Sequence, residues 1–364
     1  MTTLNAFDMF SGVGGFRIGA ELFGQEHSVS FNWVGRSEIE PKADTTYKAY
    51  FTEDDLSNWG DIQNLTGPIN SRKNCNKHIN EQLTEPIDIL FAGFPCQPFS
   101  SMGARLGLKD TRGTLFYAIA SFLKAKKPRY FILENVRGLK TDAGGKTLKM
   151  IRVILARLGY KTAVWMLNSS DYGVPQTRRR IYIVGDRTRI KGRLNDNTPP
   201  PIIPVEDRNY QTTWHLLEKK VEEKYPNKNY YLSKKIKPTI LSSGSGGYSY
   251  SWCIDNPVAK PLCRTMHKMH RASQDNYFSD SYINGKFNPK TKQIKKQNSG
   301  KKNIRRLTPL EAFRLQGLPD EMVIKAKQAG VSDTHLYMQA GNAVSATTIK
   351  EILKVLITKN DTES

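Results

Sequence analysis

The start of the chain constrains the fold most, because an apolar run there leads into a glycine-rich turn and then a helical pattern. Residues 4–10 are mostly apolar, residues 11–15 hold three glycines, and apolar residues then recur at helical spacing through Phe23. A strand, a glycine turn and a helix form the entry to a nucleotide-binding βαβ unit, where the backbone approaches a ligand at the positive end of a helix. Arg17 replaces the third glycine of the dinucleotide fingerprint, which disfavours NAD and FAD. A glycine turn alone is equally typical of close packing, so it needs support from elsewhere.

The apolar run 87–92 ends in a glycine and a proline and leads to Cys96. Open α/β sheets bind ligands just beyond the carboxyl ends of their strands, so this loop would place a thiol where chemistry occurs. A lone cysteine is more often a small buried hydrophobe. Here prolines on both sides fix the backbone, and Gln97 and Ser100 are polar neighbours, which a buried filler does not need. Cys96 is therefore a candidate nucleophile.

Three carboxylates stand at or near the expected ends of other strands. Glu38 follows the glycine turn at the interval at which an acidic residue accepts ribose hydroxyls. Asp61 could accept a hydrogen bond from an adenine amino group, and Glu134, which follows the apolar run 130–133, is a candidate acid beside the thiol. Each of them, taken alone, fits a salt bridge or a helix cap equally well.

Basic residues mark two further segments of the same part of the chain. Residues 101–113 combine three glycines with two arginines and a lysine and show no periodicity, which is typical of a mobile basic lid that closes over a substrate. Residues 178–180 are consecutive arginines that enter an apolar strand. Because neighbouring strand residues face opposite sides of a sheet, we expect a buried and paired arginine there, although a solvated edge is the usual alternative.

The charge of the chain is concentrated in one region. The 364 residues carry a net charge of +21, and residues 187–304 hold 23 Lys and Arg against 9 Asp and Glu, or +14. A concentrated excess of this kind favours a polyanionic partner, since each phosphate contact releases counterions. The four cysteines are widely spaced without a CxxC pair, so we expect no metal site and a reducing cytoplasm. No apolar run approaches the roughly 20 residues of a membrane span, and we expect neither a signal peptide nor a membrane partner.

Composition and pattern divide the chain into two domains. Residues 187–304 are rich in Pro, Lys, Asn, Ser and Gly, which predicts a loop-rich lobe. Order returns at Thr308-Pro309, a capped helix start, with Gly317 at the helix end. A final helix runs through Leu356 and would pack beside the first. We therefore expect one domain from 1–186 plus 305–364, interrupted by a smaller domain at 187–304.

Taken together, these motifs resemble the cytosine-C5 DNA methyltransferases. The Phe10–Gly15 turn resembles the S-adenosylmethionine loop, the Cys96 segment the nucleophile loop, and Glu134-Asn135-Val136 the base-contacting triplet. The Gln-x-Arg-x-Arg strand beginning at Gln176 matches too, as do the blocks 305–317 and 339–344. The resemblance implies a Rossmann-like S-adenosylmethionine-dependent methyltransferase domain with a smaller loop-rich target-recognition domain. Ile39 departs from the pattern, because many members carry Trp or another large residue there against the adenine.

The resemblance also implies a set of site residues. The catalytic residues would be Cys96, Glu134, Arg178 and Arg180, with no metal. The cofactor-binding residues would be Phe10, Ser11, Gly12, Val13, Gly14, Gly15, Glu38, Ile39, Asp61, Ile62, Pro95, Leu115 and Asn342. The DNA-binding residues would be Gln97, Ser100, Arg105, Arg112, Arg264, Arg271, Gln274 and Arg305, although the cluster within 264–274 is equally consistent with a solvated basic face.

The expected chemistry explains these residue types. Carbon 5 of cytosine is a poor nucleophile until a thiolate, here that of Cys96, adds at carbon 6. Glu134 would donate a proton or a hydrogen bond to N3, while Arg178 and Arg180 would hold the base O2 and the carboxylate or a nearby loop. Transfer of its methyl group would convert S-adenosylmethionine into S-adenosyl-L-homocysteine. A base inside a duplex cannot reach a buried thiol, so the target cytosine must flip out.

The expected setting is that of a bacterial restriction-modification methylase, which rests on analogy. We expect a monomer in the cytoplasm, associated with the nucleoid, that acts on double-stranded DNA, and the analogy allows a cognate restriction endonuclease acting on the same site. Two alternatives stay open. One is an RNA (tRNA) cytosine-C5 methyltransferase, and the other is a non-catalytic DNA-binding relative. The large basic lobe favours DNA over tRNA, and the intact catalytic positions favour an enzyme.

Overall fold

The structure is a computed structural model that describes most of the chain in two compact units. The described residues are 2–52, 56–67, 75–94, 114–187, 194–208, 210–219, 228–241, 244–245, 248–249, 254–268, 270–291, 293–295 and 303–357. The first unit comprises Met1–Leu167, Arg179–Pro201 and Thr348–Ser364, and the second comprises Asn168–Arg178 and Ile202–Thr347. Among the described helices, none is both long and apolar enough to cross a membrane.

The first unit is built on a six-stranded sheet with the order β2-β1-β3-β4-β6-β5. The strands are β1 (Thr2–Met9), β2 (Val29–Ser37), β3 (Ile89–Gly93), β4 (Tyr130–Val136), β5 (Lys161–Asn168) and β6 (Arg179–Asp186). β1 pairs in parallel with β2 and β3, and β3 with β4, whereas β6 runs antiparallel to β4. The central strands are buried on both faces, which explains their continuous apolar runs. The predicted α/β fold is confirmed.

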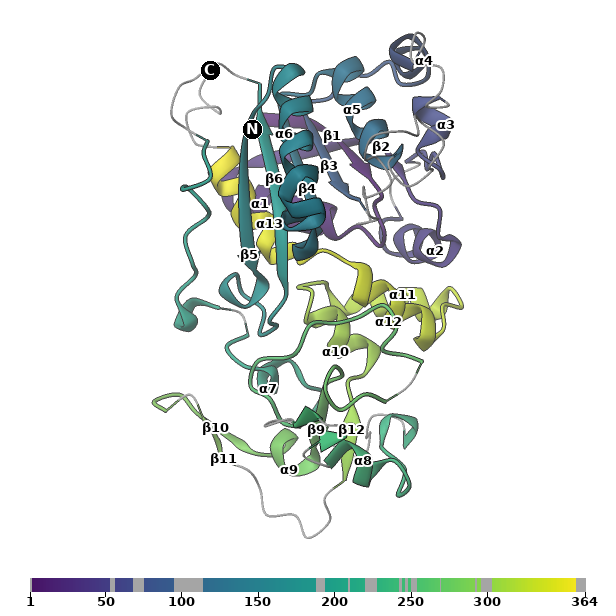
Figure 1. Cartoon of the computed structure of the whole chain (residues 1–364). Coiled ribbons are helices and arrows are strands. Elements are labelled where there is room, and N and C mark those ends of the chain that lie inside the picture. Colours follow the sequence, from purple (N-terminus) through teal and green to yellow (C-terminus); the bar gives the residue numbers. More distant parts are fainter. Residues whose placement is uncertain are drawn as a thin grey trace. The chain divides into compact units, whose positions relative to one another are not determined.

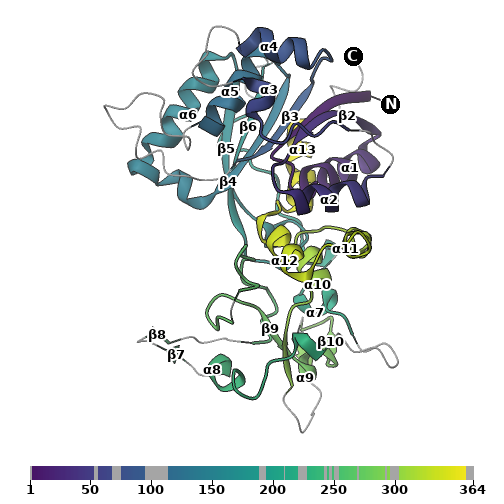
Figure 2. The ribbon, with the colours of Figure 1, turned by 90° about the vertical axis from the view of Figure 1, so that its right-hand side faces the viewer.

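Helices cover both faces of this sheet, as Figure 2 shows, with α5 and α6 on one side and α1 and α13 on the other. The helices of the first unit are α1 (Gly15–His27), α2 (Pro41–Tyr50), α3 (Gln63–Thr66), α4 (Cys75–Gln82), α5 (Thr114–Lys126) and α6 (Lys146–Arg157), together with most of α13 (Ala346–Leu356). Lys350 and Lys354 of α13 both pair with Glu26 of α1, at 2.7 and 2.9 Å. Helix α13 therefore packs beside α1, as predicted.

The second unit is loop-rich, as predicted, and the strands in its described segments are two or three residues long. It contains α7 (Thr213–Leu216), α8 (Lys237–Leu241), β7 (Gly244–Ser245), β8 (Tyr248–Ser249), β9 (Tyr277–Ser279), α9 (Asp280–Ile283), β10 (Lys286–Asn288), β11 (Gln293–Lys295), β12 (Ile304–Arg306), α10 (Pro309–Arg314), α11 (Asp320–Gln328) and α12 (Asp333–Asn342). β9 pairs with β12, and β10 with β11, in antiparallel ribbons (Figure 1). A small apolar cluster around Tyr277 and Ile304 forms one core of this unit.

Two sequence-based expectations about this unit concern residues 305–347. The helix start at Thr308 is confirmed, because its hydroxyl oxygen accepts from the Glu311 N–H and the Glu311 side chain completes a capping box. By compactness residues 305–347 group with the second unit, whereas the predicted functional division places them with the catalytic domain. Compactness and function need not follow the same boundary, so the functional division stays a prediction.

Candidate active site

The predicted cofactor residues of the first unit gather at one edge of its sheet. Strands β1, β2, β3 and β4 run in parallel, so Met9, Ser37, Gly93 and Val136 all end at the same edge. Side chains that follow these strand ends meet there. The sheet topology thus brings together residues that are far apart in the sequence.

The glycine turn after β1 is held by the end of β2. Ser37 accepts two hydrogen bonds from it, one at its hydroxyl from the Phe10 N–H at 3.1 Å and one at its carbonyl from the Ser11 N–H at 2.9 Å. Gly14 caps α1 with a φ of 91°, and a Cβ there would lie 2.6 Å from the Phe51 ring. Only glycine satisfies both demands. The turn therefore presents its backbone at the N-terminus of α1, which suits an anionic or polar ligand.

Glu38 is tied into the same turn. Its Oε2 accepts from the Gly12 N–H at 2.8 Å, and its Oε1 accepts from the Glu40 N–H at 2.7 Å. Burial raises the pKa of Glu38, and these backbone N–H groups partly offset that rise. A carboxylate has about four acceptor positions, so Glu38 can still accept from a ligand hydroxyl. Asn58, which the sequence reasoning missed, fixes this residue by accepting from the Glu38 N–H at 2.9 Å.

An apolar surface adjoins the polar turn. Ile39 is 73% exposed, which is unusual for a large apolar residue, while Phe10 and Leu115 are half-buried against the main core. Ile62 is buried, and Asp61 is exposed with its Oδ1 accepting from the Gln63 N–H. Exposed apolar side chains beside hydrogen-bonding groups are typical of a binding site for a ligand with a flat apolar part.

Glu134 lies at the end of β4, directly opposite Gly93 of β3. Its Oε1 pairs with Nε of Arg180 on β6 at 3.0 Å, and the two side chains are 11% and 17% exposed. The neighbouring Asn135 is buried and donates from Nδ2 to the Phe94 carbonyl at 3.0 Å. Asn135 therefore fixes the backbone just before the predicted nucleophile loop. In the sequence, Asn135 stands out only as the middle residue of the predicted base-contacting triplet, and this contact with Phe94 was not predicted.

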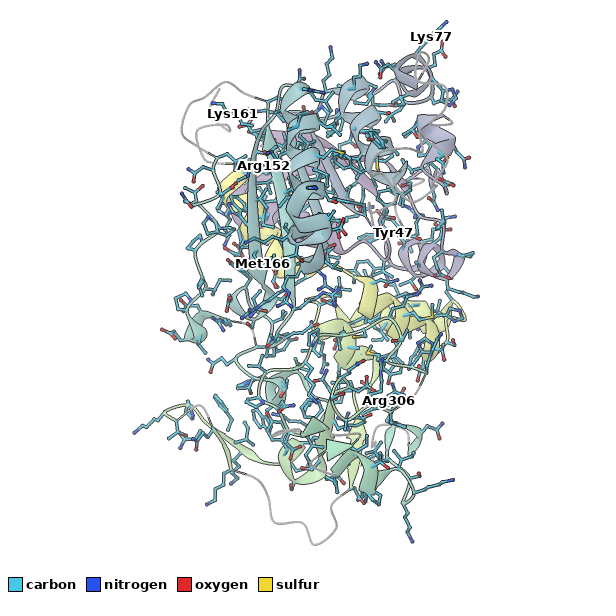
Figure 3. All side chains as sticks on the ribbon, viewed as in Figure 1. Tyr47, Lys77, Arg152, Lys161, Met166 and Arg306 are labelled. Atoms are coloured by element: carbon cyan, nitrogen blue, oxygen red, sulfur yellow. The ribbon has the colours of Figure 1, made fainter. Side chains whose placement is uncertain are left out.

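Asp8 is a second residue at this edge that the sequence reasoning missed. It is fully buried at the end of β1, and neither carboxylate oxygen has a hydrogen-bond partner among the described residues. Burial raises the pKa of Asp8 well above its usual range, and the nearby Arg36 guanidinium opposes that rise. Arg36 itself pairs with Asp44 and lies over the ring of Tyr47, which is labelled in Figure 3. An acidic residue inside an apolar run was the signal that could have revealed it.

The predicted nucleophile loop lies outside the described residues. The same holds for the lid at 101–113 and for six individually predicted residues. These residues are Cys96, Pro95, Gln97, Ser100, Arg105 and Arg112.

Arg178 belongs to the second unit and is buried, so the expected buried and paired arginine is present. Its guanidinium donates to the carbonyls of Leu262, Gly341 and Ala343, each at 3.0 Å. A Cβ on Gly341 would lie 2.4 Å from the Arg264 nitrogen, so only glycine permits this approach. Asn342, a predicted cofactor residue, follows it and is exposed. These contacts make Arg178 an organiser of backbone segments within its unit.

The other predicted DNA contacts of the second unit differ in exposure. Arg264 and Gln274 are exposed, whereas Arg271 pairs with Asp275 at 3.4 Å. Arg305 is fully buried, and its two terminal nitrogens donate to the two oxygens of Glu311 at 2.8 and 2.6 Å. This ion pair occupies the guanidinium that a DNA phosphate would need.

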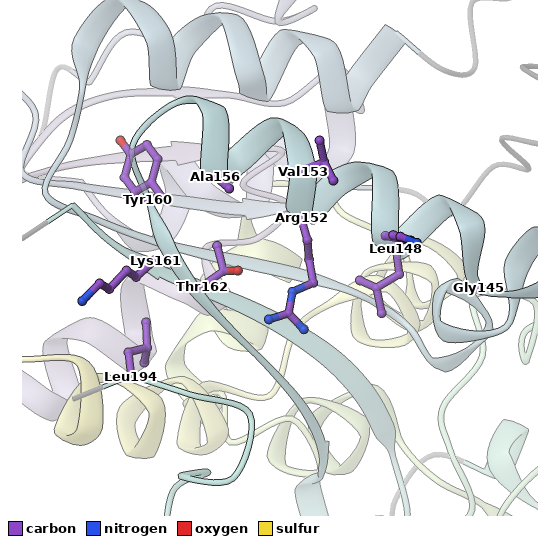
Figure 4. A pocket seen from close by; sticks show the side chains of 10 residues that line it. Gly145, Leu148, Arg152, Val153, Ala156, Tyr160, Lys161, Thr162 and Leu194 are labelled. Carbon is purple, nitrogen blue, oxygen red and sulfur yellow. The ribbon is translucent and has the colours of Figure 1, made fainter. Parts of the chain in front are cut away.

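A cavity of about 680 Å³ lies elsewhere on the first unit, between α6 and the start of β5. Figure 4 shows the Arg152 side chain reaching from α6 toward β5, with Lys161 and Leu194 beside it. Arg152 is paired with Asp196 at 2.7 Å. The lining contains none of the predicted site residues, so this cavity is separate from the strand edge that carries Glu38 and Glu134.

Comparisons with known proteins identify this arrangement. The model of the C-5 cytosine-specific DNA methylase family matches residues 4–358. Type II methyltransferase M.HaeII of Haemophilus aegyptius is 35% identical over 98% of this chain and 94% of that protein. Type II methyltransferase M.HpaII of Haemophilus parainfluenzae is also 35% identical, over 97% of this chain and 88% of that protein.

Solved structures support the fold. The Entamoeba histolytica methyltransferase EhMeth matches with a TM-score of 0.69 at 20% identity over 100% of both chains. The S. pombe Dnmt2 methyltransferase matches with a TM-score of 0.68 at 16% identity, over 97% of this chain and 98% of that chain. With a family match over nearly its whole length and close relatives above 30% identity, the chain belongs to the C-5 cytosine-specific DNA methylases, and it is an enzyme that methylates carbon 5 of cytosine in DNA.

Proposed function

We propose that this enzyme takes its methyl group from S-adenosyl-L-methionine, leaving S-adenosyl-L-homocysteine, and methylates one flipped-out cytosine within a specific duplex sequence. The observation that carries the proposal is the register between Gly93 and Glu134. It joins the end of the strand that leads toward Cys96 to a carboxylate held by Arg180. A thiol and an anchored carboxylate on adjacent strand ends are the two groups that activation of cytosine requires.

The residues of the glycine turn and its surroundings fit the methyl donor. The turn places the N-terminus of α1 beside Glu38, and exposed Ile39 offers an apolar contact for a flat ring. Asp61 and Leu115 would complete the part of the pocket that the first unit contributes, and Asn342, also a predicted cofactor residue, belongs to the second unit. When bound, the donor supplies an electrophilic methyl group beside the strand edge.

Catalysis would proceed by addition to the cytosine ring, methylation and elimination. The Cys96 thiolate forms a bond to carbon 6, and Glu134 stabilises the resulting charge by donating at N3. Carbon 5 then takes the methyl group, its proton leaves to a base, and the carbon–sulfur bond breaks to restore the ring. Arg180 holds the Glu134 side chain in place.

We further propose a role in a restriction-modification system of the bacterial cytoplasm, with the enzyme acting as a monomer near the nucleoid. The names of the type II relatives support this role. An orphan methyltransferase of Bacillus phage SPR is also similar, with 26% identity over 98% of both chains, so a cognate nuclease requires separate proof.

The test is incubation of the protein with tritiated S-adenosylmethionine and either duplex DNA or tRNA. Label in DNA alone supports the proposal, label in tRNA alone favours the RNA-methylating alternative, and no label favours a non-catalytic relative.

Cys96→Ser should abolish transfer to DNA but leave cofactor binding and DNA binding intact, because a hydroxyl is a far weaker nucleophile at neutral pH. DNA that contains 5-fluorocytosine should trap a covalent adduct with the wild-type protein, since fluorine does not leave as a proton does. Turnover by the serine variant, or no adduct that survives denaturation, would reject the thiolate mechanism.

A further inference from the structure

The β10–β11 ribbon of the second unit has two chemically different faces. Antiparallel pairing places Lys286 opposite Lys295, Phe287 opposite Ile294 and Asn288 opposite Gln293. Directly opposed residues share a face, and successive residues alternate. One face therefore carries Phe287 and Ile294, and the other carries two lysines and two amides.

The apolar face anchors the ribbon to the body of the second unit. The Phe287 ring stacks on Trp214 of α7 with centroids 5.9 Å apart, and it meets the His215 ring edge-on at 4.4 Å. Phe287 and Ile294 are half-buried, whereas Lys286, Gln293 and Lys295 are exposed. Figure 1 shows the ribbon projecting away from the other elements of this unit. The polar face is thus held outward by a rigid aromatic contact.

The positive charge on the outer face of the ribbon favours an anionic partner. Two lysines directly opposite each other on a ribbon repel, which destabilises the pairing unless an anion lies between them. Between Asp280 and Glu311 the chain has no Asp or Glu, and its basic residues there are Lys286, Lys290, Lys292, Lys295, Lys296, Lys301, Lys302, Arg305 and Arg306. Within the described part of the chain, neither Lys286 nor Lys295 has an acidic partner.

The two amide side chains of this face, Asn288 and Gln293, differ in their hydrogen bonds. The Asn288 oxygen accepts from the N–H groups of Lys290 and Thr291 at 2.9 and 3.3 Å, so it shapes the turn. The Gln293 side chain makes no hydrogen bond to another described residue, although its backbone belongs to the ribbon. A glutamine can donate to and accept from an adenine edge at the same time, and the major groove of B-DNA admits a two-stranded ribbon.

The basic cluster at 264–274 is less suited to this task. Arg271 pairs with Asp275 through its side chain, and its N–H donates to the same carboxylate at 2.9 Å. The cluster therefore carries an internal counter-charge that the outer face of the ribbon lacks.

We propose that the β10–β11 ribbon enters a groove of the substrate DNA, where Gln293 reads a base edge and Lys286 and Lys295 bind flanking phosphates. This inference rests on the proposed function and names the element that selects the sequence. Phosphate contacts set affinity and register, whereas the amide contact sets preference.

The test measures sequence preference and binding separately. Methylation of a duplex library with randomised bases around a cytosine, followed by bisulfite sequencing, gives the preference of each variant. Gln293→Ala should relax the preference at one base pair by roughly five- to a hundredfold, as expected for one lost bidentate contact. Lys286→Ala with Lys295→Ala should weaken binding to all duplexes alike and reduce the magnitude of the salt slope by about 2.

Lys286→Glu separates folding from binding. It converts the repulsive pair into an attractive one across the ribbon, so the ribbon should be at least as stable while DNA binding falls. Gln328→Ala and the double variant Lys234→Ala with Lys235→Ala are matched controls, because they remove an exposed amide and two exposed lysines elsewhere in the same unit.

The outcomes distinguish this inference from the proposed function. If wild-type protein methylates no duplex, the proposed function fails. If wild-type protein is active and Gln293→Ala keeps the full preference, the ribbon does not read sequence and the inference is overturned, even when the lysine variants bind more weakly. Loss of binding by the control variants to the same extent would also overturn it.

Discussion

Each unit of this protein contains a glutamate–arginine pair, and the two pairs differ in their surroundings. In the second unit both partners of Glu311 and Arg305 are 0% exposed, and Glu311 also accepts from the N–H groups of Glu218 and Thr308. In the first unit the side chains of Glu134 and Arg180 are 11% and 17% exposed and lie at the edge of the sheet where we propose that the ligands bind. The same chemical pair is thus fully enclosed in one unit and partly exposed in the other.

This difference is consistent with a structural role for the enclosed pair and with the catalytic role that we propose for Glu134. A buried pair with all its acceptor positions filled can only fix the segments that it joins, here β12, the start of α10 and the segment at Glu218. A pair that is partly exposed on a strand end can meet a substrate. Burial and the donors around a carboxylate therefore tell more about its role than the identity of its partner.

Of the three changes that test this comparison, exchange of Glu134 for glutamine should have the largest effect, which is on the rate of methyl transfer. Glu134→Gln should lower kcat about 10²- to 10⁴-fold, because an amide cannot supply a proton at N3 of the cytosine. The melting temperature should stay within the range of Glu85→Gln, a control at an exposed position of the same unit. Single-turnover methylation and thermal unfolding measure the two quantities. If Glu134→Gln lowers the melting temperature but keeps the rate of methyl transfer, the Glu134–Arg180 pair is structural and our assignment is wrong.

Exchange of Glu311 should act on stability instead. Glu311→Gln leaves the Arg305 charge buried without its partner and should reduce the free energy of unfolding by about 3 to 5 kcal/mol. The folded fraction should keep its rate of methyl transfer. Urea unfolding followed by circular dichroism measures the loss, with the exposed Glu321→Gln as the matched control. A loss no greater than that of the control would show that the enclosed pair adds nothing to stability.

The smallest effect concerns Asp8, a buried carboxylate of the first unit without a hydrogen-bond partner among the described residues. Because burial raises its pKa in the folded state, the stability that Asp8 contributes is fully present below the unfolded pKa of about 3.9 and is lost as the pH rises through the folded pKa. Asp8→Asn should therefore gain stability relative to wild type as the pH rises from about 4 to 8. Urea unfolding of both proteins across this range checks it, and parallel stability curves would contradict it.

Much of the local structure of both units could be predicted from the sequence, because its signals are local. The glycine turn at 11–15, the apolar runs of β3 and β4 and the cap at Thr308 each depend on neighbouring residues, and all three appear in the structure. The family could be recognised for the same reason, since its motifs are short and ordered along the chain.

The roles of single polar residues could not be predicted in this way. Arg305 has the charge of a DNA contact but is enclosed by Glu311, and Arg178 donates to three carbonyls that come from distant segments. Asp8 stands out in its apolar run, but only the structure shows that its carboxylate has no hydrogen-bond partner among the described residues, and only the structure shows the contact of Asn135 with Phe94.

The sequence by itself determined the order of strands and helices, the concentration of positive charge and the membership of a methylase family. Only the tertiary structure decided which charged groups stay accessible and which outward face the β10–β11 ribbon presents. The physical reason is that secondary structure follows from local backbone and apolar preferences, whereas the state of a polar side chain depends on burial and on partners brought from far along the chain.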